Sequence, residues 1–353
     1  MRVLCLVPYP TEGASNRLRV EQYVPELQRR GVALVLSPFL DQRAYRVLYL
    51  PGHGVAKAWA VLRGLVRRVF DVLRARRYEL VLIHREAAPV GPPFVERALT
   101  RLGVPFVYDF DDAIFLPAVH PSNRRWRWLR RFNVDETTRR ARSVIVGNEY
   151  LADWARKRNP RVTVVPTPVD TTRYTPREAS SSSPTVIGWV GSSTTQQYLH
   201  LLDDVFRRVA ERHPIVIRVV GGAYVHDTVE VQSVPWSVAS EPAEVRGFDI
   251  GVLPEPDDAW TRGKGAFKAL LYMAVGIPTV ASRVGVNPDV VGDAGLCPAD
   301  DDGWVDALER LITDVALRAR LGAAGRRRVE ERYSVGVHAP RIERVMRDAI
   351  GAV

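Results

Sequence analysis

The apolar residues of this chain form short runs that are separated by longer stretches with a helical period. Runs such as VLCLV (residues 3–7) and VIGWVG (residues 186–191) are bounded by Pro or Gly and predict buried strands. Between such runs, residues 55–77 carry one apolar stripe, formed by Trp59, Leu62, Leu65, Val66, Val69 and Leu73. We expect this stripe to pack on a sheet as an ordinary amphipathic helix. The alternation of strands and helices along the chain predicts an α/β fold.

A segment rich in proline and serine interrupts this alternation near the middle of the chain. It contains Pro176 and four consecutive serines at 180–183. A length of 353 residues is sufficient for two ordinary domains. We therefore predict two Rossmann-like domains, at 1–170 and 185–335. A linker at 171–184 joins them, and a final helix at 336–353 follows the second.

Residues 248–282 predict a strand, a polar loop, a helix and a second strand, and this unit carries the strongest chemical signal. The chain has only four lysines, and two of them, Lys264 and Lys268, lie where the loop enters the helix, next to Arg262. Free backbone N–H groups and the helix dipole at a helix N-terminus favour an anion. The compact charge of lysine suits a phosphate. We therefore predict that Lys264 and Lys268 are catalytic and compensate the charge of a departing phosphate group.

A second turn of small residues follows the strand VIGWVG. Small residues at a strand end allow a ligand to approach the backbone closely. Trp236, on a later strand-end loop, fits either stacking on a nucleobase or ordinary packing. We predict that the residues around this turn and the lysine turn bind the phosphate-bearing ligand, which is called the donor below. They are Gly191, Ser192, Ser193, Trp236, Arg262, Gly263, Gly265, Ala266 and Phe267.

Polar residues also gather where the predicted strands of the first half end. In parallel sheets these ends share one edge, where ligands bind. Ser15 or Asn16 can cap a helix whose first turn would hold two arginines, which is unfavourable without an anion. We predict that residues at these strand ends bind a second ligand, which is called the acceptor below. They are Gly13, Arg17, Arg19, Glu86, Asp109 and Asp112.

The aspartates at 109, 111 and 112 have several interpretations. They could hold a divalent cation, cap the next helix, or face an acceptor. We expect no metal, because the lysines already supply positive charge, and we assign Asp111 as the catalytic acceptor-side residue. His84, at the end of the preceding strand, fits a core histidine with a backbone partner.

The net charge of +10 is unevenly distributed. Residues 1–170 hold 29 Lys and Arg against 16 Asp and Glu, whereas the remainder is slightly acidic. The basic half indicates an anionic partner such as a membrane surface, or it reflects arginines on solvated helices. Residues 123–132 (NRRWRWLRRF) suit a membrane interface or single-stranded nucleic acid, but no nucleic-acid-binding signature accompanies them. Two distant cysteines, Cys5 and Cys297, predict buried thiols in a reducing cytosol.

Several segments resemble the GT-B glycosyltransferases, in particular the retaining family 4 (glycosyl transferases group 1). The resemblance covers nearly the whole chain and is carried by VIVGNEYLADWA, VTVVPTPVDTTRYTP, FDIGVLP, FKALLYMAVGIPTVAS and LGAAGRRRVEERYS. It implies two Rossmann-like domains that face a cleft, with the acceptor on the first domain and the sugar nucleotide on the second. It also implies that the final helix, at 336–353, crosses back to the first domain. The family's usual pair of glutamates falls at Gly263 and Leu271 in this chain. Glu255, Asp257 and Asp258 lie upstream and are possible substitutes for that pair.

The sequence thus predicts a metal-free glycosyltransferase that uses a UDP- or GDP-linked sugar and a saccharide, lipid-linked or small-molecule acceptor. We expect no cofactor, no nucleic acid, and a cytoplasmic protein at the inner face of the membrane, acting in polysaccharide or glycoconjugate synthesis. One alternative is a sugar-nucleotide epimerase or hydrolase on the same scaffold. Another is a non-catalytic basic protein that binds membranes or nucleic acid.

Overall fold

The computed structural model describes residues 1–48, 50–116, 134–177, 183–192 and 194–351. The chain divides into two compact units. Unit 1 comprises Met1–Thr167 and His338–Val353, and unit 2 comprises Pro168–Val337. The predicted basic and aromatic segment at 123–132 and the serines at 180–182 lie outside the described residues.

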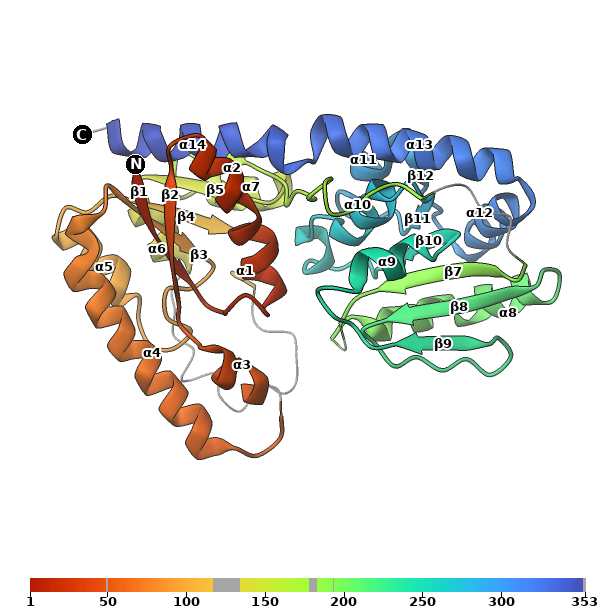
Figure 1. Cartoon of the computed structure of the whole chain (residues 1–353), viewed down its shortest axis with the longest axis horizontal. Helices are drawn as coiled ribbons and strands as arrows, with labels where there is room; N and C mark the ends of the chain where they lie inside the picture. Colours follow the sequence, from red (N-terminus) through yellow and green to blue (C-terminus); the bar gives the residue numbers. More distant parts are fainter. Residues whose placement is uncertain (49, 117–133, 178–182, 193, 352–353) are drawn as a thin grey trace. The chain divides into compact units, whose positions relative to one another are not determined.

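Unit 1 contains a six-stranded parallel sheet in the order β2-β1-β3-β4-β5-β6 (Figure 1). β1, β3, β4 and β5 are almost entirely buried, as expected for parallel strands covered on both faces. The strands are β1 (Arg2–Val7), β2 (Ala33–Pro38), β3 (Leu80–His84), β4 (Phe106–Phe110), β5 (Ser143–Val146) and β6 (Val162–Val164). The chain leaves β1 for β2 on one side and returns for β3 on the other, so the β1 and β3 ends form the switch point where α/β proteins bind ligands.

The helices of unit 1 connect these strands. They are α1 (Ala14–Arg19), α2 (Val24–Arg29), α3 (Gln42–Leu48), α4 (Gly54–Arg74), α5 (Phe94–Arg101), α6 (Val134–Arg140) and α7 (Glu149–Arg156), with short 3-10 turns at Glu21–Tyr23 and Ala75–Arg77. α14 (Val335–Gly351) belongs to unit 1 from His338 onwards. Arg30, just after α2, pairs with Glu343 of α14 at 3.2 Å.

The packing of α4 differs from the sequence prediction. The helix contacts the core through Ala60, Val61 and Leu65, and Gly64 lets it approach the ring of Phe39, since a Cβ there would lie 2.5 Å from that ring. The prediction that the whole stripe packs on a sheet is wrong, because most of its members are about half exposed or more: Trp59, Leu62, Val66, Val69 and Leu73. The helical period shows which side chains share a face, but it does not show whether another element covers that face.

Unit 2 contains a second six-stranded parallel sheet in the order β12-β11-β10-β7-β8-β9. The strands are β7 (Thr185–Val190), β8 (Ile215–Val220), β9 (Val231–Val234), β10 (Ile250–Leu253), β11 (Thr279–Ala281) and β12 (Gly295–Leu296). The helices are α8 (Asp203–Ala210), α9 (Glu241–Arg246), α10 (Phe267–Ala274), α11 (Asn287–Val291), α12 (Asp301–Thr313) and α13 (Val315–Arg332), with 3-10 turns at Gln196–Leu202, Thr261–Gly263 and Gly292–Ala294. β7 leads to β8 on one side while β10 lies on its other side, so the β7 and β10 ends form the switch point of this sheet.

The first residues of unit 2 pack on its own elements. Tyr174 is buried and its hydroxyl donates to Glu241, while Arg177 pairs with Asp249 at 2.8 Å. These residues fall within the segment for which the sequence predicts a linker.

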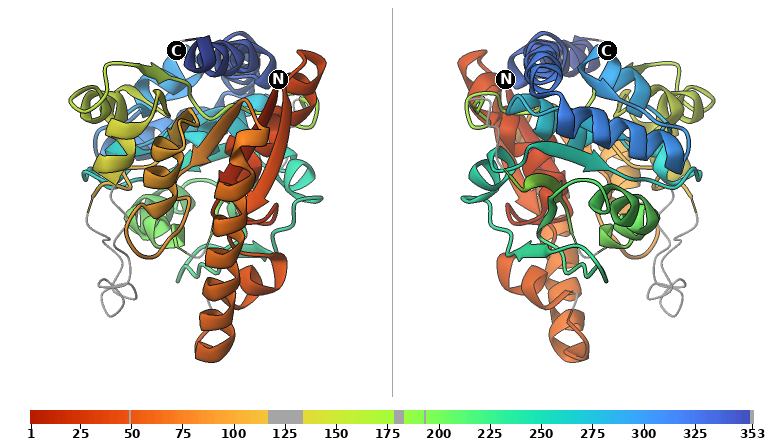
Figure 2. Two further views of the ribbon diagram at one scale, coloured as in Figure 1. Left: turned by 90° about the vertical axis from the view of Figure 1, so that its left-hand side faces the viewer. Right: turned by 90° about the vertical axis from the view of Figure 1, so that its right-hand side faces the viewer.

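Figure 2 shows the chain from two further sides, with the orange helix α4 extending well past the sheet of unit 1. No helix in the described ranges is long and apolar enough to cross a membrane.

Candidate functional site

Lys264 lies at the end of the loop that follows β10. Its ammonium group is 3.5 Å from the carboxylate of Glu255 and 4.7 Å from the centre of the Tyr198 ring. Only 17% of the Lys264 side chain is exposed. The lysine is therefore held at the surface of unit 2 by a carboxylate and an aromatic face instead of extending into solvent.

Lys268, one turn further on, has an unusual environment for a lysine. Its ammonium group donates to the hydroxyl of Thr195 at 3.2 Å and lies 4.4 Å from the centre of the buried Trp189 ring. Burial and, to a smaller extent, the nearby charge of Lys264 together lower the pKa of Lys268 to about 7, with Glu255 opposing in part. A lysine in this state gains from an added negative charge, because an anion would restore its protonated form.

The N-terminus of α10 brings backbone donors to the same place. Ala266 precedes the helix in a left-handed conformation (φ 53°), and no side chain within the described part of the chain caps this helix end. The first N–H groups of a helix lack intrahelical acceptors and carry partial positive charge. Two lysines and these N–H groups together make a site that fits a phosphate.

The turn after β7 contacts Lys268 directly. A Cβ at Gly191 would lie 2.4 Å from the Trp189 ring and 3.0 Å from Cε of Lys268, so glycine is needed for both side chains to fit. Gly221, with φ of 84°, approaches the carbonyl of Gly191 and the side chain of Trp236. The structure thus brings Gly191 and Trp236 to the region of the lysine turn. Ser192 bonds Thr194 through its hydroxyl, and Ser193 is not among the described residues.

Trp236 and Arg262 each have partners within unit 2. The indole of Trp236 donates to Glu241, and Arg262 makes a two-bonded, half-exposed pair with Asp257 at 2.6 and 2.9 Å. Gly263 is buried, and the space beside Gly265 is open.

The structure distinguishes the three acidic residues that could substitute for the family's glutamate pair. Glu255 is almost fully buried, lies beside Lys264, and accepts from the amide of Asn287 at 3.1 Å. Asp257 pairs with Arg262, and Asp258 accepts from the backbone of Thr261. Only Glu255, among these three, is next to a lysine of the turn. The sequence indicated Glu255 only together with Asp257 and Asp258, and its place two residues after the end of β10 was the signal that could have distinguished it.

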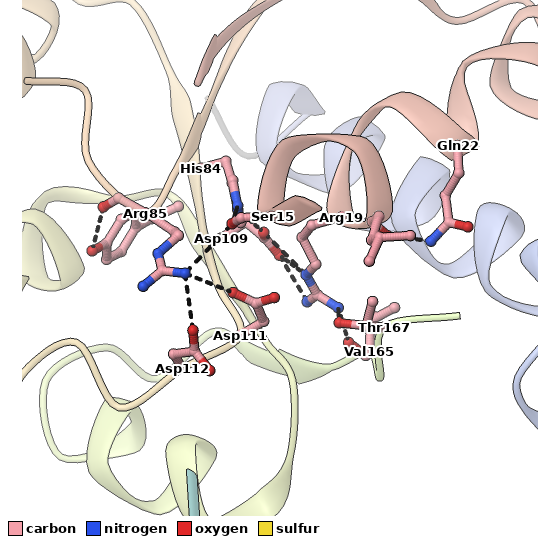
Figure 3. A network of polar contacts seen from close by, with 12 residues as sticks. Ser15, Arg19, Gln22, His84, Arg85, Asp109, Asp111, Asp112, Val165 and Thr167 are labelled. Carbon is pink, nitrogen blue, oxygen red and sulfur yellow. Dashed lines mark hydrogen bonds and ion pairs between the residues drawn. The ribbon is translucent and has the colours of Figure 1, made fainter. Parts of the chain in front are cut away.

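Unit 1 has its own polar network at the ends of β1, β3 and β4 (Figure 3). His84 is fully buried, with Nδ1 2.7 Å from a carboxylate oxygen of Asp109 and Nε2 2.7 Å from the hydroxyl of Ser15. Arg19 holds the same carboxylate at 2.8 Å and donates to the carbonyl of Val165. Burial opposes the charge of Asp109, but Arg19 and His84 outweigh it and lower the pKa of Asp109.

An ionised Asp109 fixes the proton on His84. The carboxylate requires a donor, so Nδ1 carries the proton and Nε2 accepts from Ser15. Ser15, His84 and Asp109 therefore form a chain along which a proton can move from the half-exposed hydroxyl of Ser15. The sequence did not indicate this chain, because its members come from three separate segments.

The helix-start argument for the N-terminal arginines is wrong. Gly13, not Ser15 or Asn16, is the N-cap of α1, and Arg17 and Arg19 lie in the last turn, where cations are favourable without an added anion. Arg17 donates to the carbonyl of Thr11 at 3.1 Å. A Cβ at Gly13 would lie 2.5 Å from the side chain of Tyr9.

Arg85 separates the three aspartates into two groups. It has a left-handed backbone (φ 58°), a strained conformation for a non-glycine residue, and donates to Asp112 at 2.9 Å. Burial alone would lower its pKa, but Asp112 and Asp111 reverse this and raise the pKa of Arg85. Asp109 instead faces Arg19 and His84, so the three carboxylates do not converge on one point.

Other acceptor-side residues add little to this geometry. Glu86 follows at the end of β3, with its N–H donating to the carbonyl of His84 at 2.8 Å. One buried oxygen of Asp111 accepts no hydrogen bond from the described residues. The part of the chain that the structure describes contains no group of three His, Cys, Asp or Glu side chains placed to hold a metal.

Two family models match the chain and together cover most of it. The model for Glycosyltransferase Family 4 matches residues 19–173, and the model for Glycosyl transferases group 1 matches residues 184–314. These matches and the two Rossmann-like sheets define the class of the protein as a glycosyltransferase with the GT-B fold. The chain belongs to the group 1 glycosyltransferases of family 4, which confirms the predicted fold class, family and enzyme class.

Solved structures with a similar fold include three glycosyltransferases. Sucrose-phosphate synthase from Thermosynechococcus elongatus has a TM-score of 0.71 at 15% identity, over 100% of this chain and 99% of that chain. A glycosyltransferase from Rickettsia africae has a TM-score of 0.71 at 11% identity, over the same shares of the two chains. Anabaena HepE in complex with UDP-glucose has a TM-score of 0.66 at 15% identity, over 99% and 100%. At these identities the likeness establishes the fold alone.

One curated relative matches a short segment. An MMP alpha-(1->4)-mannosyltransferase from Mycolicibacterium hassiacum is 45% identical over 71 residues. The segment covers 19% of this chain and 17% of that relative.

Proposed function

We propose that this glycosyltransferase moves a sugar from a nucleoside-diphosphate sugar to a saccharide, lipid-linked or small-molecule acceptor, without a metal, in cell-envelope polysaccharide or glycoconjugate synthesis. The observation that carries the proposal is the pair of lysines at the N-terminus of α10. Cleavage of the sugar–phosphate bond leaves negative charge on the diphosphate, and fixed cations and N–H groups stabilise that charge as it develops.

Each part of the lysine turn has a role in this proposal. Lys264 and Lys268 hold the diphosphate, together with the backbone from Gly265 to Phe267. Lys268 becomes fully protonated as the diphosphate binds, because the anion offsets the burial that lowers its pKa to about 7. Gly191 and Ser192 contact the donor at the end of β7, Arg262 contributes to the diphosphate site, and Trp236 contacts the nucleobase. The predicted donor contact of Ser193 lies outside the described residues.

Glu255 is suited to the donor's hydroxyl groups. Its carboxylate is held by Lys264 and Asn287, and a buried carboxylate accepts hydrogen bonds from sugar hydroxyls. This assigns to Glu255 the donor contact that the usual pair of glutamates would make.

Unit 1 binds the acceptor through the loop and strand ends that carry Gly13, Arg17, Glu86 and Asp112. Asp111 is the acceptor-side base; its Oδ1 accepts no hydrogen bond from the described residues and lies 4.0 Å from the guanidinium group of Arg85. Arg19 and Asp109 position His84 and the hydroxyl of Ser15.

The comparisons guide the choice of ligands for a test. Anabaena HepE was solved with UDP-glucose, and the short curated match is to a mannosyltransferase, so UDP-glucose and GDP-mannose are the first donors to try. The basic N-terminal half supports a cytoplasmic enzyme that works at an anionic membrane surface on a lipid-linked acceptor.

The direct test is turnover of a sugar nucleotide by wild type and Lys264→Ala, with Lys157→Ala, an exposed lysine of unit 1, as a matched control. Lys264→Ala should lose about 100-fold in turnover with its fold intact, and Lys157→Ala should be unchanged. Full activity of Lys264→Ala would remove the basis of the proposal. Activity should also persist in EDTA, whereas a strict need for Mg²⁺ would contradict the metal-free step.

Incubation without an acceptor distinguishes a transferase from an epimerase or hydrolase. A transferase leaves most of the sugar nucleotide intact until an acceptor is added. Rapid conversion without acceptor would favour the alternative.

A further inference from the structure

The exposed face of α4 contains most of the apolar surface that the described chain presents to solvent. Of the eleven large hydrophobic side chains exposed in the described residues, eight lie between residues 50 and 73. The most exposed of these eight are Val55 at 76%, Leu73 at 71%, Phe70 at 62% and Trp59 at 60%. A contiguous exposed patch of this kind on a water-soluble domain indicates an interaction surface.

The apolar residues follow a regular spacing along the helix. Val55, Trp59, Leu62, Val66, Val69 and Leu73 recur at alternating steps of four and three residues, so they form one stripe. The opposite face packs through Ala60, Val61 and Leu65. α4 is thus apolar on two faces, and the core of unit 1 covers only one of them.

Buried polar contacts fix the orientation of α4 on the sheet. Arg68 is fully buried and donates to the carbonyl of Val7 at 2.9 Å and to Asp71 at 2.7 Å. Turning the helix so that the exposed stripe faced inward would expel this ion pair and leave carbonyls unpaired. The exposure of the stripe is therefore a fixed property of unit 1.

The charges around the stripe are almost all positive. Residues 54–77 contain a single acid, Asp71, which is buried and paired with Arg68 and Arg74. The basic residues of this segment are Lys57, Arg63, Arg67, Arg68, Arg74, Arg76 and Arg77. An acid of a neighbouring element, Asp41, pairs with Arg63 at 3.4 Å. The surface therefore carries a clear excess of positive charge.

A shallow hollow continues the stripe towards β2. It has a volume of about 570 Å³ and combines apolar residues with arginines. Its lining includes Trp59, Leu62, Val66 and Phe70 together with Arg63 and Arg67. Apolar side chains flanked by guanidinium groups match a lipid layer, in which acyl chains lie directly below phosphates.

We infer that this exposed face of α4 docks unit 1 on a bilayer that contains anionic phospholipid, with Trp59 and Phe70 entering the acyl region and Lys57, Arg63 and Arg67 contacting phosphates. This inference rests on the proposed function, because docking on the bilayer would give the enzyme access to a lipid-linked acceptor. A second copy of the chain is a poorer partner. If α4 packed against α4 of a second copy, the arginines of the two helices would face each other, and the helix has no exposed acid to pair with them.

Sedimentation with vesicles tests the inference. Wild type should bind vesicles of phosphatidylcholine with phosphatidylglycerol, bind pure phosphatidylcholine much more weakly, and dissociate as salt is raised. The double variant Trp59→Ser/Phe70→Ser should bind at least about tenfold more weakly, because two large apolar side chains no longer enter the lipid. Lys57→Gln/Arg63→Gln should lose a similar factor on the anionic vesicles only.

A matched control uses exposed apolar residues of unit 2. Leu201→Ser/Val225→Ser replaces side chains that are 48% and 78% exposed, and it should bind vesicles as wild type does. Quenching of tryptophan fluorescence by brominated lipid should be smaller in Trp59→Phe than in wild type. Stabilisation by UDP or GDP should be the same in all these variants, so a failure of the nucleotide site is distinguished from a failure of docking.

Three results would overturn the inference. The first is wild-type binding to anionic vesicles that the Trp59 and Phe70 substitutions leave unchanged, and the second is no binding by wild type. The third is a concentration-dependent dimer in sedimentation that these substitutions abolish, which would assign the face to a second copy of the chain.

Discussion

The two units of this protein both place cations at the switch point of a parallel sheet, but they differ in what surrounds those cations. In unit 1, Arg19 and Arg85 lie against Asp109 and Asp112, and these carboxylates raise the pKa of both arginines. In unit 2, Lys268 lies against a hydroxyl and an aromatic ring, and its pKa is lowered to about 7.

This difference shows where an incoming anion would gain most. The arginines of unit 1 already have their counter-charges, and their main effect is to fix the positions of Asp109, His84 and Ser15. Lys268 is destabilised as a cation, so a diphosphate would relieve that cost. Charge count alone points to the basic N-terminal half, whereas the environment of the charges points to unit 2.

Removing Arg19 should have the largest effect and should act on stability. Arg19→Met leaves the buried carboxylate of Asp109 with only a hydrogen bond from His84 among the side chains named here, and breaking a buried ion pair costs about 3–5 kcal/mol. Chemical denaturation should show this loss in the free energy of unfolding. Lys268→Met is the control, since it strands no carboxylate, and its free energy of unfolding should equal or exceed that of wild type.

Removing Lys268 should have the next largest effect and should act on catalysis. Lys268→Met should lower turnover of the sugar nucleotide by about 100-fold, equivalent to about 3 kcal/mol of transition-state stabilisation. Steady-state kinetics on the folded variant measures this. If Lys268→Met turned over the sugar nucleotide at the wild-type rate, the claim that the cation of unit 2 acts in catalysis would be wrong.

A methyl group at Gly191 should have a smaller effect on the same site. In Gly191→Ala the added Cβ meets the Trp189 ring and Cε of Lys268, so the lysine must shift. We expect about tenfold weaker nucleotide binding, which calorimetry would detect. Gly265→Ala is the matched control for an added methyl group, because the space beside Gly265 is open. Its affinity for the nucleotide should be close to that of wild type.

The pH dependence of stability tests the same lysine without any ligand. The unfolded chain keeps the lysine proton up to about pH 10.5, whereas folded Lys268 releases it near pH 7. Between these values the unfolded state binds more protons, so the free energy of unfolding rises with pH. The free energy of unfolding of wild type should therefore increase relative to that of Lys268→Met as the pH increases from 7 to 10. A difference between the two proteins that does not change with pH would mean that the pKa of Lys268 is not lowered.

The sequence predicted the fold and the lysine turn because both depend on local patterns. Short apolar runs, the turn at Gly191, and the two lysines just before and within FKALLYMA are each contained in one short segment. The contacts that the sequence did not predict join separate segments. Ser15, His84 and Asp109 meet only because β1, β3 and β4 lie side by side, and Glu255 reaches Lys264 across a loop. The exposed stripe of α4 was misread because apolar periodicity is the same on a covered face and an uncovered one.

The central claim is that the lysine turn of unit 2 holds the diphosphate of the nucleotide. Calorimetric titration of UDP and GDP into wild type and Lys268→Met, in two buffers of different ionisation enthalpy at about pH 8, tests it most directly. We expect wild type to bind at least one of the two nucleotides with uptake of a proton, and Lys268→Met to bind it more weakly with no uptake. Equal affinity and equal proton uptake in the two proteins would contradict the claim.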